Sequence, residues 1–512
     1  MTAHSVPNTL MAPLERRSVQ LVLFLLVGLV TRAAVFGDLS YFADENFYHI
    51  AGLRMHDGLL PYVGIWDRKG PGLFLTYYLI TAFGSSVLTT QIAAWLFASL
   101  TAFVINLIGE RFSGRLGALL AGMLYLAALP LLGGAGGQTP VFYNLWTALA
   151  ALLVLRANDR LSLGRAPGSL FAAMALAGFA ITYKQTAVVE GAFLGVYALW
   201  RLSRGGMELP RLIRTASLMA LCGLAPFAAF ALVWAALGHF AEFWHAMVTA
   251  NLAKPVNVAG DQWVRLCALA VLAAPLLVAA GAGLVLPGDP AARPAQPATV
   301  PSRVFLIGWV AAGLGGLFLV PNFYEHYMLP LALPLAAVGA RALDRRPVGL
   351  VAGVVGVTFY LIAARSLEFA DRAKARTAVL DIAGQIRGRD PQPRLFVYEG
   401  PMELYPLLGS YPPSPLLDTF HLYFPAEDNT SHLDTAAEVR RILAWQPSVV
   451  VTFRDFPPGE ENARTGPLVR GYVRQRCRLW FTRTYFENYR AYPLEIWGDC
   501  AQGAGGAVTT GR

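Results

Sequence analysis

The sequence alternates between apolar runs of about twenty residues and short polar loops, and this pattern constrains the fold more than any other feature. A helix needs about 20 consecutive apolar residues to cross a bilayer core, and such runs recur over most of the chain before Ser366. Charged residues make up 14% of the 512, whereas soluble proteins have about 25%. The chain is therefore predicted to be an integral membrane protein with several spans.

We predict about eleven membrane spans from the apolar segments. They lie near 18–37, 89–108, 116–134, 140–156, 168–183, 186–203, 212–236, 263–286, 304–320, 328–343 and 348–364. The first segment follows Arg16 and Arg17 without a cleavage-site pattern, so we interpret it as a retained helix that starts in the cytoplasm.

The basic residues favour the same topology. Arginines gather in alternate loops, and the opposite loops are nearly free of them, which is the positive-inside pattern. The net charge of +9 is thus a topological signal and does not indicate nucleic-acid binding. The apolar stretch 72–84 would reverse the pattern if it crossed the membrane, so we expect it to lie flat on the outer surface as an amphipathic helix. An odd number of spans then places the chain after Ser366 outside.

The segment 367–500 differs in kind from the rest, because it is polar and contains strand-like stretches. The strand-like stretches are 394–399, 448–453 and 492–498, and a helical stretch lies at 434–446. They predict a small extracytoplasmic α/β domain. Within it, Cys477 and Cys500 are a candidate disulfide, with two free thiols as the alternative. The composition of 501–512 is typical of disorder. The domain division is therefore a membrane module over 1–366, with a first external loop at 38–88, followed by this domain.

Lysine is rare in this chain, and no lysine lies in a predicted cytoplasmic loop. The ammonium group is a compact charge that binds phosphate well. The alternative is that these side chains only reach the outer lipid headgroups. We favour a functional role for Lys69 and Lys184, and we expect Lys254 only to contact the outer lipid headgroups.

Three stretches with charged or hydroxyl side chains map to the outer ends of predicted spans, and one outward-facing cavity would gather them. They are 42–79, 178–191 and 321–334. The first begins with the acidic pair Asp44 and Glu45 and continues to the knot "WDRKGPG", which opens an aromatic helix. The other two contain "YKQT" and "EHYMLPLALP".

This arrangement resembles the GT-C membrane glycosyltransferases, in the branch that contains protein O-mannosyltransferases and the lipid A aminoarabinose transferase. The resemblance covers about the first 370 residues and implies a GT-C fold. It implies that Asp44 is the catalytic carboxylate and that Lys69 contacts the donor phosphate, and that His326 and Tyr327 are the polar pair at the start of a late span. The chemistry of a departing phosphate adds Arg68 or His326 as a second stabilising group beside Lys69. The other candidate site residues are Glu45, Lys184, Glu325 and Tyr327.

The chain has no nucleotide-sugar domain or glycine-rich phosphate loop, so we expect a donor that is already in the membrane, such as a polyprenyl-phosphate-linked sugar. Asp44 would act as general base on the acceptor hydroxyl, and Lys69 would stabilise the departing lipid phosphate. The predicted function is inverting sugar transfer to an envelope acceptor, which is a lipid, glycan or protein, outside the bacterial inner membrane. The alternatives are a lipid or glycan transporter (a flippase) and an envelope polysaccharide polymerase or ligase.

Each site assignment has a simpler alternative. Asp44 is also a candidate N-cap of the following helix, and Glu45 a residue that orients it. Asp44, Glu45 and His49 are of the types that bind divalent metals, but their spacing does not indicate a metal site. No cofactor is predicted.

Overall fold

The computed structural model describes residues 15–253, 261–286, 302–456, 459–487 and 490–500. The chain divides into two compact units, each made of three separate segments. Unit 1 comprises Met1–Ala34, Gln91–Phe230 and Val256–Leu367. Unit 2 comprises Val35–Thr90, Ala231–Pro255 and Glu368–Arg512. The first external loop thus groups with the chain after Glu368, whereas the sequence-based division placed it in the membrane module.

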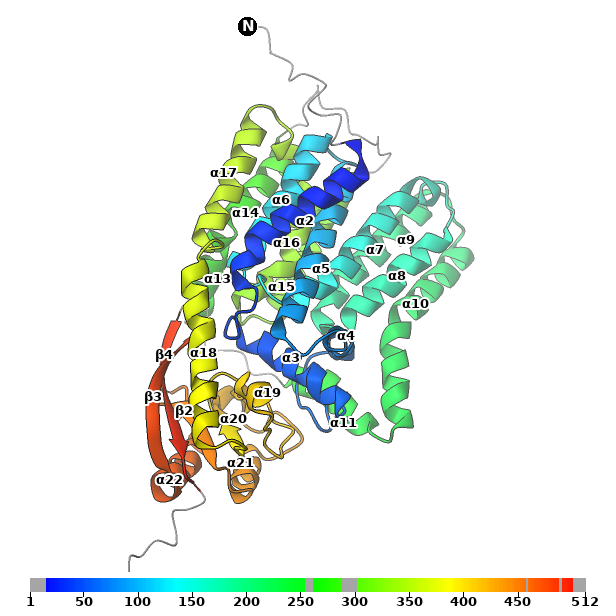
Figure 1. The fold of residues 1–512 in the computed structure, drawn as a ribbon. Coiled ribbons are helices and arrows are strands. Elements are labelled where there is room, and N and C mark those ends of the chain that lie inside the picture. Colours follow the sequence, from blue (N-terminus) through cyan, green and yellow to red (C-terminus); the bar gives the residue numbers. More distant parts are fainter. Residues whose placement is uncertain (1–14, 254–260, 287–301, 457–458, 488–489, 501–512) are drawn as a thin grey trace, which may run out of the picture. The chain divides into compact units, whose positions relative to one another are not determined.

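Unit 1 is built from apolar helices (Figure 1). The helices that lie wholly or mostly in it are α2 (Arg17–Arg32), α5 (Val87–Gly109), α6 (Arg115–Leu131), α7 (Thr139–Leu161), α8 (Gly168–Ile181), α9 (Val188–Arg204), α10 (Leu209–Ala236), α13 (Asp261–Leu272), α14 (Ala274–Val285), α15 (Ser302–Leu319), α16 (Leu329–Leu343) and α17 (Val348–Ala363). Each predicted apolar segment therefore contains a helix or, for α13 and α14, a bent pair.

Helix length separates these helices into two groups. Four of the described helices are long and apolar enough to cross a membrane, and the α13–α14 pair, bent by 73°, makes a fifth if it is one span. Several others, including α6, α8 and α17, are apolar but shorter. The chain is a multi-pass membrane protein by these criteria, and the count of eleven spans stays a prediction.

Helix α16 lies at the centre of unit 1, where it packs against α6, α14 and α15. Small residues allow these backbones to approach closely. A Cβ atom on Gly283 of α14 would lie 2.3 Å from the carbonyl oxygen of Val338, and one on Gly117 of α6 would lie 2.2 Å from that of Ala340. A side chain at either glycine would push the helices apart.

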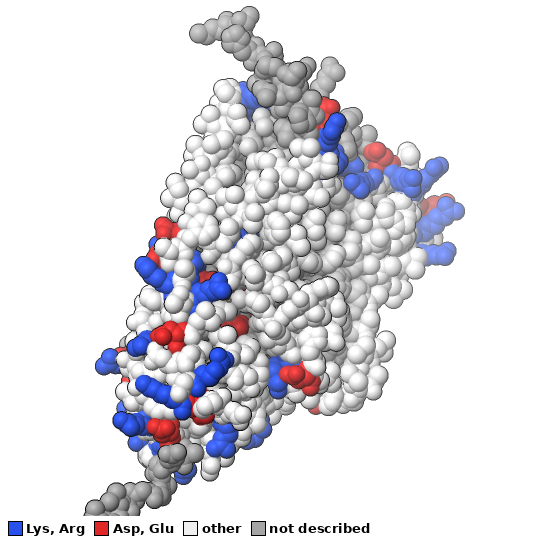
Figure 2. Space-filling view, in the orientation of Figure 1, with Lys and Arg blue, Asp and Glu red and all other residues white. Residues whose placement is uncertain are grey.

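The charges on unit 1 are unevenly placed. On the face drawn in Figure 2, the surface over the helices is nearly free of charge, and basic side chains gather at the loops that join α7 to α8 and α9 to α10. Exposed arginines of this region include Arg160, Arg165 and Arg204. Helix α8 lies between Arg165 and Lys184 in the sequence, and its 14 residues span about 21 Å.

Unit 2 contains the α/β region expected from the tail, together with the helices of the first external loop. Its helices include α3 (Ala43–His56), α4 (Pro71–Thr81), α11 (Phe240–Trp244), α12 (Ala250–Leu252), α18 (Phe369–Arg389), α19 (Leu404–Leu408), α20 (Phe420–Tyr423), α21 (Thr435–Ala444) and α22 (Gly466–Arg476). Its strands are β1 (Leu395–Val397), β2 (Val449–Phe453), β3 (Arg478–Glu487) and β4 (Arg490–Gly498).

The four strands form one mixed sheet in the order β1-β2-β4-β3. Strands β1 and β2 are parallel and completely buried, which fits their β-branched composition. Strands β2, β4 and β3 pair antiparallel, and α18 packs against β3. Cys477 and Cys500 form a disulfide beside β3 and β4. The predicted disorder of 501–512 lies outside the described residues.

Helix α4 occupies the stretch that we expected to lie flat, but it is not amphipathic. Its exposed side chains include Leu79, at 53% exposure, and the following Phe83 is 88% exposed. The helix is apolar on its open face as well as on its packed one, since its side chains are nearly all apolar or aromatic. An apolar open face suits contact with lipid, although the orientation to a bilayer stays a prediction.

Candidate functional site

The acidic pair lies in the first turn of α3, where carboxylates favour the positive end of the helix dipole. The N-cap position is Phe42, whose side chain makes no capping bond, so the alternative role of Asp44 as N-cap is wrong. The cap comes instead from the other end of the sequence: Glu487 Oε1 accepts a hydrogen bond from the Ala43 backbone N–H, at 3.1 Å. The Asp44 carboxylate does not cap the helix and instead pairs with Lys69.

Asp44 and Lys69 are brought together in unit 2. Asp44 Oδ2 lies 3.7 Å from Lys69 Nζ, and the two side chains are 31% and 25% exposed. The ammonium also lies 5.1 Å from the ring centroid of Tyr48, one turn along α3 from Asp44. Burial alone lowers the pKa of Lys69, but Asp44, Tyr48 and Asp67 outweigh it and raise the pKa well above its usual value. Lys69 is therefore a permanent cation next to a half-buried carboxylate.

The backbone around Lys69 is fixed from three sides. Asp67 Oδ1 accepts hydrogen bonds from the backbone N–H groups of Arg68 and Lys69. The hydroxyl of Tyr62 donates to the Lys69 carbonyl at 2.9 Å, and the Asn251 amide donates to the Arg68 carbonyl at 3.2 Å. Since the main chain has little freedom here, the position of the ammonium depends mainly on the lysine side chain itself.

Arg68 and Lys69 form ion pairs with different carboxylates. Its guanidinium forms a buried ion pair with Glu427, and the two side chains are 9% and 6% exposed. The charge of Arg68 is thus already engaged by a carboxylate from the tail, which weakens its candidacy for the donor phosphate. Its Nη1 is buried and makes no hydrogen bond.

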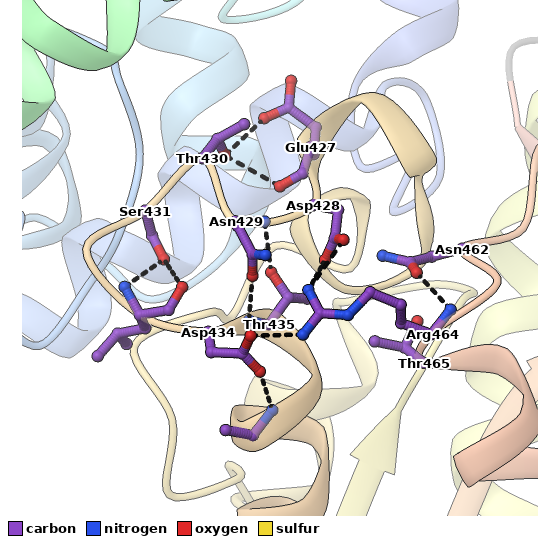
Figure 3. Close-up of polar contacts among 12 residues, drawn as sticks. Glu427, Asp428, Asn429, Thr430, Ser431, Asp434, Thr435, Asn462, Arg464 and Thr465 are labelled. Atoms are coloured by element: carbon purple, nitrogen blue, oxygen red, sulfur yellow. Dashed lines mark hydrogen bonds and ion pairs between the residues drawn. The ribbon is translucent and has the colours of Figure 1, made fainter.

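The loop that supplies Glu427 is held by a polar network (Figure 3). The guanidinium of Arg464 bridges Asp428 and Asp434. The side chain and backbone of Asn429 exchange two 2.9 Å hydrogen bonds with Thr435. These contacts fix the loop on which Glu427 stands.

Further carboxylates of the tail surround α3, and sequence reasoning missed them. Burial, then the charge of Glu45, raises the pKa of Glu403 to about 8. Burial raises the pKa of Glu487 to about 7, and this effect exceeds the opposing one of the Ala43 hydrogen bond. These carboxyl groups are therefore partly protonated near neutral pH, which limits the negative charge around Asp44.

His49 is accounted for by local contacts. Its Nδ1 lies 3.2 Å from Thr90 Oγ1, and its Nε2 lies 3.2 Å from the Ser85 carbonyl oxygen. Burial lowers its pKa to about 4, so the ring is neutral at physiological pH. It connects α3 to Ser85 and to Thr90 in the first turn of α5. Among the described residues, Asp44, Glu45 and His49 do not form a metal-binding group.

The other candidate residues lie in unit 1. Lys184 Nζ lies 3.9 Å from the ring centroid of Tyr327, and both residues line a pocket with Glu190 and Tyr143. Glu190, which the sequence analysis did not name, accepts a 2.9 Å hydrogen bond from the Trp309 indole. The pocket therefore holds a cation, a buried carboxylate and aromatic rings.

His326 and Glu325 lie in the short 3₁₀ turn η5 (Glu325–Met328) before α16, directly before the pocket residue Tyr327 in the sequence. The His326 ring packs edge-on against Tyr327, with centroids 4.7 Å apart, and stacks on Tyr324 at 6.0 Å. Sequence reasoning grouped His326 with Lys69 at one phosphate. The structure places the first in unit 1 and the second in unit 2, and their joint role stays a prediction.

Comparison with solved structures identifies the fold. No protein-family model matches the chain, and no curated protein matches it. The crystal structure of ArnT from Cupriavidus metallidurans in the apo state superposes with a TM-score of 0.61 at 16% identity, covering 95% of this chain and 98% of that one. The fold is that of the GT-C membrane glycosyltransferases.

The match to ArnT includes the tail, because it extends over 95% of the chain. The GT-C resemblance seen in the sequence rests on about the first 370 residues and is weak in the tail, whereas the structural similarity extends over the α/β region as well. A weaker similarity, with a TM-score of 0.48 at 11% identity, relates 85% of the chain to 69% of the apo oligosaccharyltransferase from Archaeoglobus fulgidus.

Proposed function

We propose that this protein transfers a sugar from a polyprenyl-phosphate-linked donor to an envelope acceptor, with inversion at the anomeric carbon. The observation that carries the proposal is the 3.7 Å pair of Asp44 and Lys69, both partly open to solvent. A carboxylate and an ammonium group that lie together in a half-buried position supply the two charges that such a displacement needs. The GT-C fold supports the same reading.

The reaction is a single displacement. As the oxygen of the acceptor hydroxyl attacks the anomeric carbon, Asp44 takes the proton of that hydroxyl. The bond from that carbon to the phosphate oxygen breaks, its electron pair leaves with the lipid phosphate, and Lys69 stabilises the added negative charge. In the resting protein the two side chains neutralise each other. A donor phosphate that binds Lys69 replaces Asp44 as its partner and releases the carboxylate to act as base.

The charge pattern of unit 1 supports a site on the extracytoplasmic side. The exposed arginines of the α7–α8 and α9–α10 loops lie at one end of these helices, and Lys184 follows the other end of α8. The arginine-rich end is the cytoplasmic one under the positive-inside rule. Lys184 and Tyr327 then lie at the outer end, where they line a second polar pocket for donor or acceptor.

Reconstituted sugar transfer tests the proposal. The full-length protein is placed in liposomes with radiolabelled polyprenyl-phosphate sugars and a bacterial envelope lipid extract as acceptor, and label is followed from carrier to acceptor. We expect Asp44→Asn to slow transfer by at least about 100-fold. We expect Lys69→Met to slow it by about 100- to 1,000-fold, the range for losing one group that stabilises developing charge.

Matched controls are Asp57→Asn and Lys374→Met. Asp57 is an exposed acid just after α3, and the side chain of Lys374 on α18 is 71% exposed; both variants should transfer at the wild-type rate. The proposal fails if wild-type protein leaves all label on the carrier, or if Asp44→Asn transfers normally. Label that crosses the bilayer while still attached to the carrier would identify a flippase instead.

A further inference from the structure

Strand β3 forms an open edge of the sheet in unit 2. The strand order is β1-β2-β4-β3, so β3 pairs with β4 alone. Among the described residues, no backbone hydrogen bond joins β3 to any segment other than β4. Half of its 10 residues are exposed. The N–H and C=O groups that point away from the neighbour of an edge strand are unpaired, so β3 presents a row of backbone donors and acceptors.

This edge starts in a run of arginines. Arg474 and Arg476 lie in the last turn of α22, and Arg478 opens β3; all three are exposed. Arg483, further along β3, is also exposed, and its Nη1 donates to the Thr482 carbonyl oxygen at 3.2 Å. This contact places the guanidinium beside the backbone of the strand. Positive charge therefore follows β3 from its start to beyond its middle.

A further guanidinium comes from α18, which packs beside β3 (Figure 1). Arg389 is exposed, and its guanidinium carbon lies 5.5 Å from the ring centroid of Trp480 and 4.9 Å from that of Phe481. The register with β4 shifts at this place, and such bulges change the direction of a side chain. A guanidinium stacked on aromatic rings is held in position, while its planar fork of N–H groups still fits a carboxylate.

Two acids near this edge already have partners. Asp381 of α18 pairs with Arg483 at 3.1 Å, and Asp499 accepts a 3.0 Å hydrogen bond from the Trp480 indole. The side chains of the Arg483–Asp381 pair are 46% and 49% exposed, and an ion pair this open to water contributes little stability. An incoming carboxylate can therefore share or replace Asp381. The arginines outnumber these acids, so the edge favours an anionic partner.

We propose that the β3 edge binds an extended, acidic segment of another polypeptide, which joins the sheet as a fifth strand. The row of backbone groups selects a polypeptide, because only another main chain matches its spacing. The arginines select glutamate or aspartate side chains on that segment. In strand addition, main-chain hydrogen bonds supply affinity and the side chains supply specificity. The inference goes beyond the proposed sugar transfer and does not depend on it.

The same features disfavour two other occupants of the edge. Pairing with β3 of a second copy would bring the arginines of two chains together, and like charges on paired strands are destabilising. Uncharged strands are disfavoured as well, since charged side chains and bulges limit indiscriminate pairing at sheet edges. A carboxylated glycan would contact the arginines but would leave the backbone row unused.

Binding of a defined peptide tests the inference. A fluorescent octapeptide of alternating valine and glutamate is titrated with the full-length protein in detergent, and its anisotropy is measured at low and at high salt. We expect saturable binding that weakens with salt. Reversing one charge, in Arg478→Glu or in Arg389→Glu, should weaken binding at least about tenfold. Arg440→Glu, at an exposed position on α21, should bind like wild type.

Two matched probes separate strand pairing from charge alone. The same peptide with N-methylated backbone nitrogens keeps its carboxylates but loses main-chain donors, and it should bind at least about tenfold more weakly. Sodium alginate, a carboxylated glycan, should fail to displace the peptide at an equal concentration of carboxylate. Hydrogen–deuterium exchange of residues 478–487 in wild-type protein should slow when the peptide binds, and this readout needs no variant that must fold.

The inference is overturned if wild-type protein does not bind the peptide, or if both charge reversals bind as tightly as wild type. It is also overturned if the N-methylated peptide binds as tightly as its parent, if alginate displaces the peptide, or if exchange in β3 stays unchanged. None of these readouts requires transfer activity, so this result and that of the transfer assay are independent.

Discussion

Glu487, at the end of strand β3, caps the helix that carries Asp44 by accepting the backbone N–H of Ala43 at 3.1 Å. The two residues are 444 positions apart in the sequence. The tail of the protein is therefore a structural part of the candidate catalytic loop, since it satisfies a backbone donor at the first turn of α3.

Removing this cap should loosen α3 at Asp44. Glu487→Leu deletes the acceptor, and loss of a helix cap typically costs about 1 kcal/mol. We expect faster hydrogen–deuterium exchange of residues 43–46 and a lower rate of sugar transfer. Glu487→Gln keeps a carbonyl oxygen at the same place and should restore slow exchange. Equal exchange in Glu487→Leu and wild type would show that the bond does not hold the helix.

The pH dependence of stability should change in Glu403→Gln. Burial and Glu45 raise the pKa of Glu403 from 4.5 to about 8, so the folded state binds its proton more tightly than the unfolded state. This contribution is fully present below pH 4.5 and is lost as the pH rises to about 8. Thermal midpoints between pH 5 and 9 should therefore fall less steeply with pH in the variant. Glu460→Gln, at an exposed position, should match wild type.

A buried ion pair predicts a large loss of stability in Arg372→Met. Arg372 on α18 lies 3.2 Å from Asp38, and the side chains are 6% and 1% exposed. Removing one member of a buried pair costs about 3–5 kcal/mol, because the other charge stays buried. We expect rapid proteolysis of the segment 35–42 and of α18.

Two further variants check the cause of that loss. The double variant Arg372→Met with Asp38→Asn should recover much of the stability, since no uncompensated charge is left. Arg483→Met breaks an exposed pair with Asp381, whose side chains are 46% and 49% exposed, and should cost less than about 1 kcal/mol. If Arg372→Met were as mild as Arg483→Met, the buried pair would not stabilise unit 2.

The disulfide should stabilise the sheet edge at β3 and β4. It closes a loop with a sequence separation of 23 residues, which corresponds to about 3 kcal/mol in the chain-entropy account. Reduction, or Cys500→Ser, should therefore increase protease cleavage in β3. Changing Cys222 and Cys267, which are free, to serine should have no such effect. Unchanged cleavage after reduction would contradict the prediction.

Local patterns were sufficient for most of the elements. The apolar segments predicted the helices of unit 1. Short apolar stretches predicted β1 and β2, whose residues are all buried, and an alternating stretch predicted β4. Strand β3 was missed, since its sequence RLWFTRTYFE has no regular apolar–polar alternation and half of its 10 residues are exposed. Its strand character follows from pairing with β4, which a single segment does not reveal.

The site was predictable only where its residues lie close in the sequence. Asp44 and Lys69 are 25 positions apart, the first at the start of α3 and the second just before α4, so motif reasoning could pair them. Glu487 and Glu427 reach the same loop from the far end of the chain. Their types and local contexts are unremarkable in a polar domain, and only tertiary contacts reveal them.

The division of unit 2 into three segments has a consequence for biosynthesis. Ribosomes add about 5–20 residues per second, so roughly 20–90 seconds separate the synthesis of Ala43 from that of Glu487. During that interval the nascent polypeptide exposes an α3 without its distal cap. A chain released early, before β3, would insert its apolar helices yet lack a completed first loop. Premature termination before Glu487 should therefore abolish function as fully as loss of Asp44.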